Sequence, residues 1–181
     1  YVIKFGKDHR SHTYGRLTET IPYISILYDG GNIVNTKLPG EYNFYNIMAA
    51  ICIGKYFNVP VDAIRRSLEE YKPEINRSQI LEFKGARVLL DAYNANPSSM
   101  HAAIESFYSQ PKLGERLLIL GDMYELGKES NKEHKKILAL LKEQKLKNVI
   151  LLGEEFKNAA KGFEQFIYYD DFNSLKDWFI S

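Results

Sequence analysis

Several features that mark particular protein classes are scarce or absent in this sequence of 181 residues. The single cysteine, Cys52, excludes an internal disulfide, and its apolar surroundings predict a buried thiol that packs as a hydrophobic side chain. No apolar run approaches the ~20 residues of a membrane-spanning helix, and the N-terminal segment lacks the apolar stretch of a signal peptide. We therefore expect a soluble, cytoplasmic protein without membrane insertion.

The sequence also lacks an excess of charge of either sign. Lys+Arg 24 against Asp+Glu 23 gives a net charge of +1, without the basic excess that binding to phosphate backbones requires, so we expect no nucleic-acid partner. The hydrophobic content of 45% and aromatic content of 13% are those of a chain that buries roughly 70% of its unfolded surface. This composition excludes a disordered protein.

Recognisable metal-binding and nucleophile motifs are missing as well. The histidines do not form an HExxH pattern, Cys52 has no zinc-ligand partner, and no G-x-S-x-G elbow is present. We therefore predict no metal site and no catalytic nucleophile. His134, on a predicted helix, is expected at the surface, and the acidic pair Glu154-Glu155 is expected on a solvated face.

The first 75 residues combine predicted strands with a pair of helices. Strands are expected at 2–5, 21–28 and 33–37, the last two joined by a hairpin whose glycines permit positive φ. From Asn43 the apolar residues recur at helical spacing, and after the break at Asn58-Val59-Pro60 a second helix is expected over 62–71. The pattern predicts a β-hairpin followed by an αα-hairpin. Proline at position 73 favours a domain boundary at 72–76, which predicts domains 1–75 and 76–181.

The second part of the chain alternates predicted strands with predicted helices. Strands are expected at 79–83, 87–92, 116–120, 148–152 and 165–169, with helices at 97–109, 131–144, 154–161 and 172–180. Asn96 is a candidate N-cap ahead of Pro97, and Ser130 with Glu133 matches a capping box. The alternation predicts an α/β fold with a mainly parallel sheet covered by helices on both faces.

Two loops at predicted strand ends, where α/β proteins bind ligands, are rich in polar residues. The segment 91–97 (DAYNANP) places a carboxylate, a phenol and two carboxamides ahead of a helix, as either a ligand site or an ordinary capped turn. The segment 121–128 (GDMYELGK) misses the P-loop pattern, because five residues separate its glycines and Glu129 follows Lys128. We reject a P-loop and favour a structural role for this second loop.

Four segments, in the same order along the chain, resemble the motifs of the Mur ligase family. These are LPGEYNFYNIMAA (38–50), NRSQ (76–79), DAYNANPSSM (91–100) and GDMYELG (121–127). The YNANP and GDMxELG patterns are most similar to the type that joins D-alanyl-D-alanine to UDP-N-acetylmuramoyl-tripeptide. The resemblance implies that residues 1–75 are the end of a central ATPase domain, without its P-loop, and that residues 76–181 are most of a Rossmann-like C-terminal domain.

The resemblance also implies residues that bind the nucleotide. Asn43 and Asn46 match residues that face the adenine of ATP, Arg77 matches an arginine that reaches the nucleotide, and Asp91 matches a carboxylate that binds ribose hydroxyls. The family often has histidine where Tyr42 stands, so the sequence departs from the pattern here. The main phosphate and Mg²⁺ sites would lie outside this chain.

For the amine substrate, the resemblance implies that Tyr93, Asn94 and Asn96 orient D-alanyl-D-alanine. The implied activity, in cell-wall peptidoglycan synthesis, is ATP-dependent amide ligation through an acyl phosphate, with no catalytic side chain in this chain. We expect a monomer that closes about 72–77 and is inactive as an isolated chain. Two alternatives stay open: a folylpolyglutamate synthase-like ligase, and a non-catalytic module that binds a nucleotide or peptide.

Overall fold

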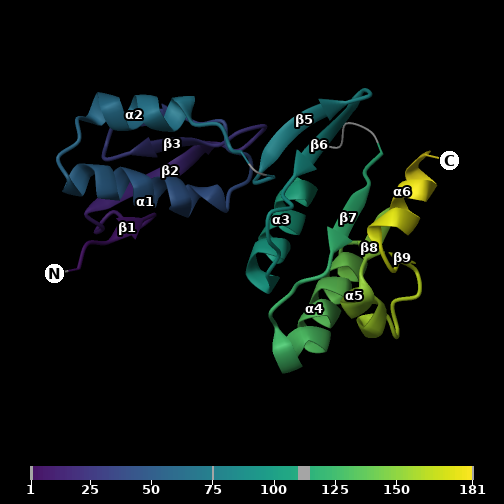
Figure 1. Cartoon of the computed structure of the whole chain (residues 1–181). Helices are drawn as coiled ribbons and strands as arrows, with labels where there is room; N and C mark the ends of the chain where they lie inside the picture. The colour runs from purple at the N-terminus through teal and green to yellow at the C-terminus, as the bar shows by residue number, and fades with distance from the viewer. Residues whose placement is uncertain (1, 75, 110–114, 181) are drawn as a thin grey trace. The chain divides into compact units, whose positions relative to one another are not determined.

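The computed structural model describes residues 2–74, 76–109 and 115–180 (Figure 1). The chain forms two compact units, Tyr1–Tyr93 with Glu105–Gln110 and Asn94–Ile104 with Pro111–Ser181, and each is described by itself. Residue 75, at the predicted domain boundary, lies outside the described residues, and the division into 1–75 and 76–181 stays a prediction. No helix in the described part of the chain is long and apolar enough to span a membrane.

The first unit begins with a four-stranded sheet in the order β1-β2-β3-β4. Its strands are β1 (Phe5–Gly6), β2 (Thr13–Glu19), β3 (Ser25–Tyr28) and β4 (Asn32–Asn35). Strands β3 and β4 pair antiparallel as the predicted hairpin, and positive φ at Asp29 and Gly30 forms its turn. The ion pair between Asp29 and Lys55 ties this turn to the following helix.

Three details of this sheet differ from the prediction. The first strand is only Phe5–Gly6, and Val2 is 73% exposed. The strand expected at 21–28 begins only at Ser25, after Pro22, which lacks the N–H that a sheet ladder needs. Strand β2 was not predicted, because its side chains TYGRLTE are mostly polar and only Thr13 and Gly15 are buried at the period of two.

Helices α1 (Asn43–Tyr56) and α2 (Val61–Glu70) form the predicted αα-hairpin and pack on the strands (Figure 1). The apolar face of α1 follows the i, i+3, i+4, i+7 pattern, and each of its four residues is 2% exposed or less: Phe44, Ile47, Met48 and Ile51. They share one core with Ile24, Ile26, Tyr28 and Val34 of the strand region and with Ile64 of α2. This core fixes the N-terminus of α1, where the predicted adenine contacts lie.

The next two strands, β5 (Gln79–Phe83) and β6 (Ala86–Leu90), pair antiparallel as a separate two-stranded ribbon. They therefore do not belong to the parallel sheet. Helix α3 (Pro97–Ser109) follows, and Asn96 caps it as predicted, because the Ser99 backbone N–H donates to Asn96 Oδ1 at 2.9 Å. The segment between β6 and α3 is the first polar loop.

The second unit contains a parallel sheet in the order β7-β8-β9, made of β7 (Leu118–Gly121), β8 (Val149–Leu152) and β9 (Ile167–Tyr169). Its helical segments are η1 (Gly127–Glu129), α4 (Ser130–Glu143), α5 (Glu154–Ala159) and α6 (Phe172–Ile180). Strand β8 is buried from Val149 to Leu151, and Leu138 and Leu141 of α4 and Phe156 of α5 are fully buried as well. The predicted Rossmann-like α/β class is confirmed, and the second polar loop follows β7 at the carboxyl edge of this sheet.

Candidate functional site

Asn43 and Asn46 form a pair at the start of α1 whose orientation is fixed by hydrogen bonding. The Pro39 carbonyl can only accept, so Asn43 Nδ2 donates to it at 2.8 Å, and Asn43 Oδ1 consequently accepts from Asn46 Nδ2 at 3.0 Å. Asn43 is buried, whereas Asn46 is exposed. Within the described part of the chain, Asn46 Oδ1 accepts no hydrogen bond, so it is available to a ligand.

Asp91, directly after β6, is held by hydrogen-bond donors on both carboxylate oxygens. The backbone N–H of Ser78 donates to Oδ1 at 3.2 Å, and the hydroxyl of Tyr42 donates to Oδ2 at 3.3 Å. The same hydroxyl lies 2.8 Å from Ser78 Oγ. The Asp91 residue is exposed, and each carboxylate oxygen retains a second lone-pair direction. Two vicinal hydroxyls match this arrangement of acceptors.

The backbone that precedes the ribbon is tightly constrained. Asn76 and Ser78 have positive φ of 57° and 46°, on either side of Arg77, and the Ala92 N–H donates to the Asn76 carbonyl at 2.7 Å. A positive φ is sparsely populated by residues other than glycine, so the hydrogen bond that Ala92 donates and the one that Asp91 accepts offset a local conformational cost. The constraint sets the direction in which Arg77 leaves the backbone.

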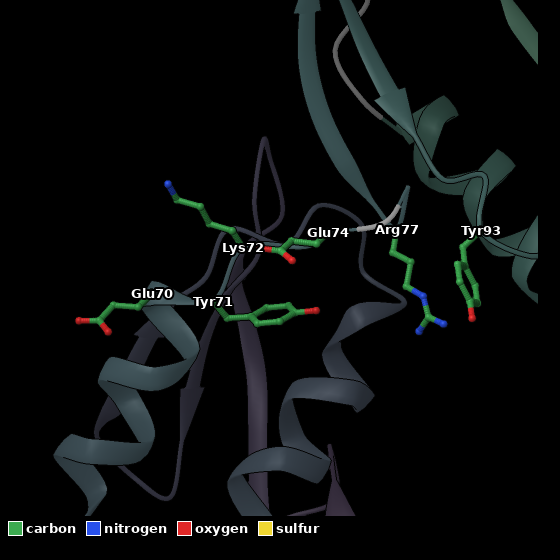
Figure 2. Close-up of a pocket in the computed structure, with 6 residues that line it drawn as sticks. All are labelled: Glu70, Tyr71, Lys72, Glu74, Arg77 and Tyr93. Atoms are coloured by element: carbon green, nitrogen blue, oxygen red, sulfur yellow. The ribbon is translucent and has the colours of Figure 1, made fainter.

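Arg77 lies over the ring of Tyr93, with Cζ 3.8 Å from the ring centroid, and both residues line an open cleft of about 600 Å³ (Figure 2). This stacking uses the face of the guanidinium and leaves its in-plane N–H groups directed outward. Figure 2 shows the Tyr71 hydroxyl directed toward the Arg77 side of the same space. The other residues that line the cleft are the charged Glu70, Lys72 and Glu74.

Asn94 and Asn96 begin the second unit and are both exposed. Asn96 Oδ1 accepts from the Ser99 N–H and from Ser98 Oγ at 2.8 Å, so its carbonyl oxygen serves the helix cap. Asn94 carries no such structural bond within the described residues. A role for these two side chains toward a dipeptide stays a prediction.

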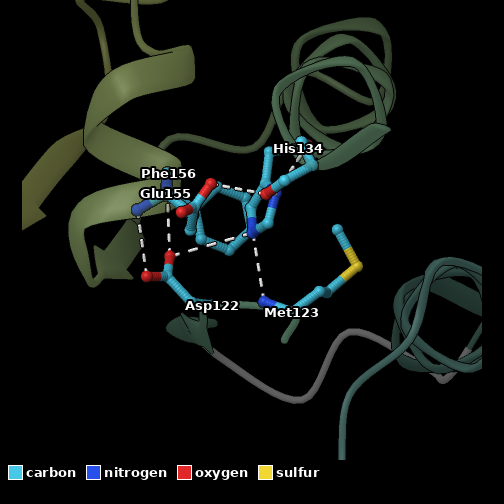
Figure 3. A network of polar contacts seen from close by, with 6 residues as sticks. Asp122, Met123, His134, Glu155 and Phe156 are labelled. Carbon is cyan, nitrogen blue, oxygen red and sulfur yellow. Dashed lines mark hydrogen bonds and ion pairs between the residues drawn. The ribbon is translucent and has the colours of Figure 1, made fainter. Parts of the chain in front are cut away.

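The loop after β7 is held by Asp122, a residue that is 9% exposed (Figure 3). It accepts the backbone N–H groups of Glu155 at 3.0 Å and Phe156 at 2.9 Å, and so caps α5 from a distant part of the chain. Gly153 permits this approach, because a Cβ at that position would collide with the carboxylate. The structural role favoured for this loop agrees with the geometry.

His134 is fully buried in the same network, which corrects the expectation that it lies at the surface. The Met123 N–H donates to His134 Nε2 at 3.0 Å, so Nε2 must be unprotonated, and the proton on Nδ1 is donated to the Ser130 carbonyl at 2.8 Å (Figure 3). The neutral ring packs edge-on against Phe156, with centroids 4.6 Å apart. The i, i+4 spacing between Ser130 and His134 is the sequence signal that could have indicated a hydrogen-bonded histidine here.

The capping box predicted at Ser130 is also wrong. Glu129, and not Ser130, stands at the N-cap of α4, and no side chain caps this helix end. The Ser130 hydroxyl donates instead to Glu155 Oε2 and lies 3.3 Å from His134 Nδ1. Glu155 is consequently half-buried and hydrogen-bonded rather than solvated. This polar network links α4, α5 and the loop after β7.

The described residues contain no group of three or more His, Cys, Asp or Glu side chains that could hold a metal ion. Cys52 is buried, as predicted. Among the candidate residues of the first unit, Asn46 and Asp91 are exposed and Arg77 lines the cleft. A carboxamide, a carboxylate and a cation of this kind can bind a polar, partly anionic ligand, but they include no nucleophile.

Comparison with known proteins finds similarity over most of the chain. The family described as Mur ligase, glutamate ligase domain, matches residues 76–178. The UDP-N-acetylmuramoyl-tripeptide--D-alanyl-D-alanine ligase of Treponema pallidum is 32% identical over 160 residues, which are 88% of this chain and 34% of that protein. The chain thus spans about a third of the length of this curated relative.

Solved structures agree at the level of the fold. A crystal structure of MurF from Acinetobacter baumannii matches with a TM-score of 0.83 and 23% identity, covering 98% of this chain and 39% of that one. MurF from Thermotoga maritima in complex with ADP matches with a TM-score of 0.77 and 22% identity, covering 96% and 41% respectively. The likeness extends over both units of the chain.

Proposed function

The chain belongs to the Mur ligase family, and we propose that it is part of an ATP-dependent amide ligase. In that ligase, this part would close over the nucleotide and position the amine substrate. The ligase adds D-alanyl-D-alanine to UDP-N-acetylmuramoyl-tripeptide in peptidoglycan synthesis. The relative from Treponema pallidum carries this activity in its name and supports the choice of substrates. The observation that carries the proposal is the exposed Asp91 carboxylate, held by two donors and still able to accept two more hydrogen bonds.

The side chains of the first unit are suited to ATP. Asp91 would accept the ribose hydroxyls, and the exposed Asn46 would accept from the adenine amino group through Oδ1. Asn43 would then act by orienting Asn46, because its own amide is engaged by Pro39. The outward N–H groups of Arg77 would bind a phosphate, which guanidinium groups recognise in a bidentate manner. These donors and acceptors complement one nucleotide.

The reaction requires few groups from this chain. In the proposed sequence, ATP phosphorylates the terminal carboxylate of the tripeptide, and the amine of D-alanyl-D-alanine attacks the acyl phosphate, releasing phosphate beside the ADP already formed. Magnesium accompanies ATP and would be held mainly outside this chain. Positioning of the reactants and exclusion of water are the contributions we assign here. Tyr93, Asn94 and Asn96 would orient the dipeptide.

The isolated chain would lack ligase activity, because the sequence contains no P-loop to hold the triphosphate. In the longer ligase, closure about residues 72–77 would bring the C-terminal part to the nucleotide. We propose that the ligase acts as a monomer, since the reaction as written needs no residue from a second copy.

The test is a phosphate-release assay on a full-length ligase that contains this chain, with UDP-N-acetylmuramoyl-tripeptide as acceptor. Turnover with D-alanyl-D-alanine and none with glutamate is expected. Turnover with glutamate on a folate acceptor would instead support the folylpolyglutamate synthase-like alternative. Nucleotide binding by the full-length protein without turnover on either pair would support the non-catalytic module. The 181-residue chain alone is the control, and phosphate release from it would contradict its proposed inactivity.

A further inference from the structure

Tyr42 connects two parts of the candidate nucleotide site. It stands at the N-cap position of α1, next to Asn43, and its hydroxyl reaches Ser78 and Asp91, which lie 36 and 49 residues further along the chain. A phenol has one proton. If that proton is donated to Asp91 Oδ2, the 2.8 Å contact must be a hydrogen bond donated by Ser78 Oγ to the phenol oxygen. The bonds therefore run in one direction, from Ser78 through Tyr42 to Asp91.

The phenol is held firmly enough to act in this way. Its ring packs against the backbone of Gly40, where φ is +82° and where a Cβ would collide with the ring. Burial, with a further contribution from the charge of Asp91, raises the pKa of the Tyr42 hydroxyl, so the group remains a proton donor at neutral pH. Ser78 is 7% exposed, so its side of the chain of bonds is shielded from water.

A carboxylate with donors on both oxygens has its rotation restricted. The Ser78 N–H fixes Oδ1, and Tyr42 fixes Oδ2, so the two remaining acceptor directions of Asp91 are fixed as well. We infer that Tyr42 is a positioning residue of the nucleotide site, which orients Asp91 toward the two ribose hydroxyls and thereby contributes to selection of a ribonucleotide. This inference rests on the proposed function, since it takes ATP as the ligand of Asp91.

The test compares KM values for ATP and for 2′,3′-dideoxyadenosine triphosphate in a full-length ligase that contains this chain. The KM for the dideoxynucleotide divided by the KM for ATP gives a ratio that measures the contacts to the ribose hydroxyls. Tyr42→Phe removes the hydroxyl but keeps the ring on Gly40, and we expect it to raise KM for ATP about fivefold. KM for the dideoxynucleotide and kcat should both change less than twofold. Tyr45→Phe, at a 54% exposed position on the same helix, is the matched control and should leave the ratio unchanged.

Asp91→Ala separates failure of this inference from failure of the proposed function. A ratio that falls to about one in Asp91→Ala, and part of the way in Tyr42→Phe, supports both. A ratio that falls in Asp91→Ala and not in Tyr42→Phe overturns the role of Tyr42 alone. A ratio that is unchanged in Asp91→Ala overturns the ribose contact and the inference together. Equal loss of kcat with both nucleotides in Tyr42→Phe would indicate a merely structural role and would also overturn the inference.

Discussion

Removal of the Asp122 carboxylate should destabilise the second unit and leave the side chains of the candidate nucleotide site unchanged. In Asp122→Ala, the N–H groups of Glu155 and Phe156 lose their acceptor, and α5 loses its N-terminal cap. Phe156 is fully buried, so its N–H gains no easy replacement from water, whereas Glu155 is only half-buried. The helix end also loses a negative charge that opposes the positive end of its dipole.

The magnitude follows from these contacts. A hydrogen bond to a charged group contributes about 1.5–3 kcal/mol, and loss of an N-cap side chain costs about 0.5–2 kcal/mol. Hydration of the Glu155 N–H offsets part of the first contribution. We therefore expect the free energy of unfolding of this unit to fall by about 2–4 kcal/mol. Asp122→Asn keeps one acceptor oxygen, so its free energy of unfolding should fall by about half as much.

Urea unfolding followed by tryptophan fluorescence measures this change in the relevant unit, because the single tryptophan, Trp178, lies on α6. With a slope of about 1.5 kcal/mol/M, the midpoint should fall by about 1–3 M. Tyr124→Phe, in the same loop at a 72% exposed position, is the control and should shift the free energy by less than about 0.5 kcal/mol. A midpoint in Asp122→Ala equal to that of the control would refute the assigned capping role.

Three further predictions concern other contacts. Gly153→Ala should destabilise the second unit by about 2 kcal/mol or more, because φ is +116° and the new Cβ meets Asp122; an unchanged urea midpoint would contradict this. The Ser174 backbone N–H holds the pKa of Asp171 below its ordinary range, so stability from this α6 cap should be present above that range and lost as the pH falls through the lowered pKa. Asp171→Asn should abolish this acid-dependent loss in unfolding experiments, since asparagine still accepts the bond. Arg77→Lys in the full-length ligase should raise KM for ATP about tenfold, because lysine lacks the bidentate fork; an unchanged KM would remove Arg77 from the site.

The elements that the sequence predicted well are those whose signal is local. The apolar spacing of α1 marked its buried face, and the Asn96-Pro97 pair marked the start of α3, because a cap and a first turn are set by adjacent residues. Strand β2 carried no such signal, since Thr13 and Gly15, its buried positions, are not large apolar residues. Its position depends on pairing with β3, which is tertiary information.

The same distinction applies to the candidate site. Motif resemblance selected Asp91 and Asn46, but it did not show that Tyr42 bonds to Asp91 across 49 positions. The burial of His134 also depends on a distant neighbour, the Met123 N–H, and on the packing of Phe156 against its ring. Spacing in the sequence identifies which residues are chemically suited to a ligand. Their available lone pairs become known only when the rest of the chain is in place.

A structure of a full-length ligase containing this chain, with a non-hydrolysable ATP analogue, would show whether Asp91 binds the ribose of the nucleotide. We expect ribose hydroxyls at about 3 Å from the Asp91 carboxylate and the adenine amino group at hydrogen-bonding distance from Asn46 Oδ1. A nucleotide bound with its ribose away from Asp91, while Asp91 keeps its bonds to Tyr42 and Ser78, would contradict this expectation.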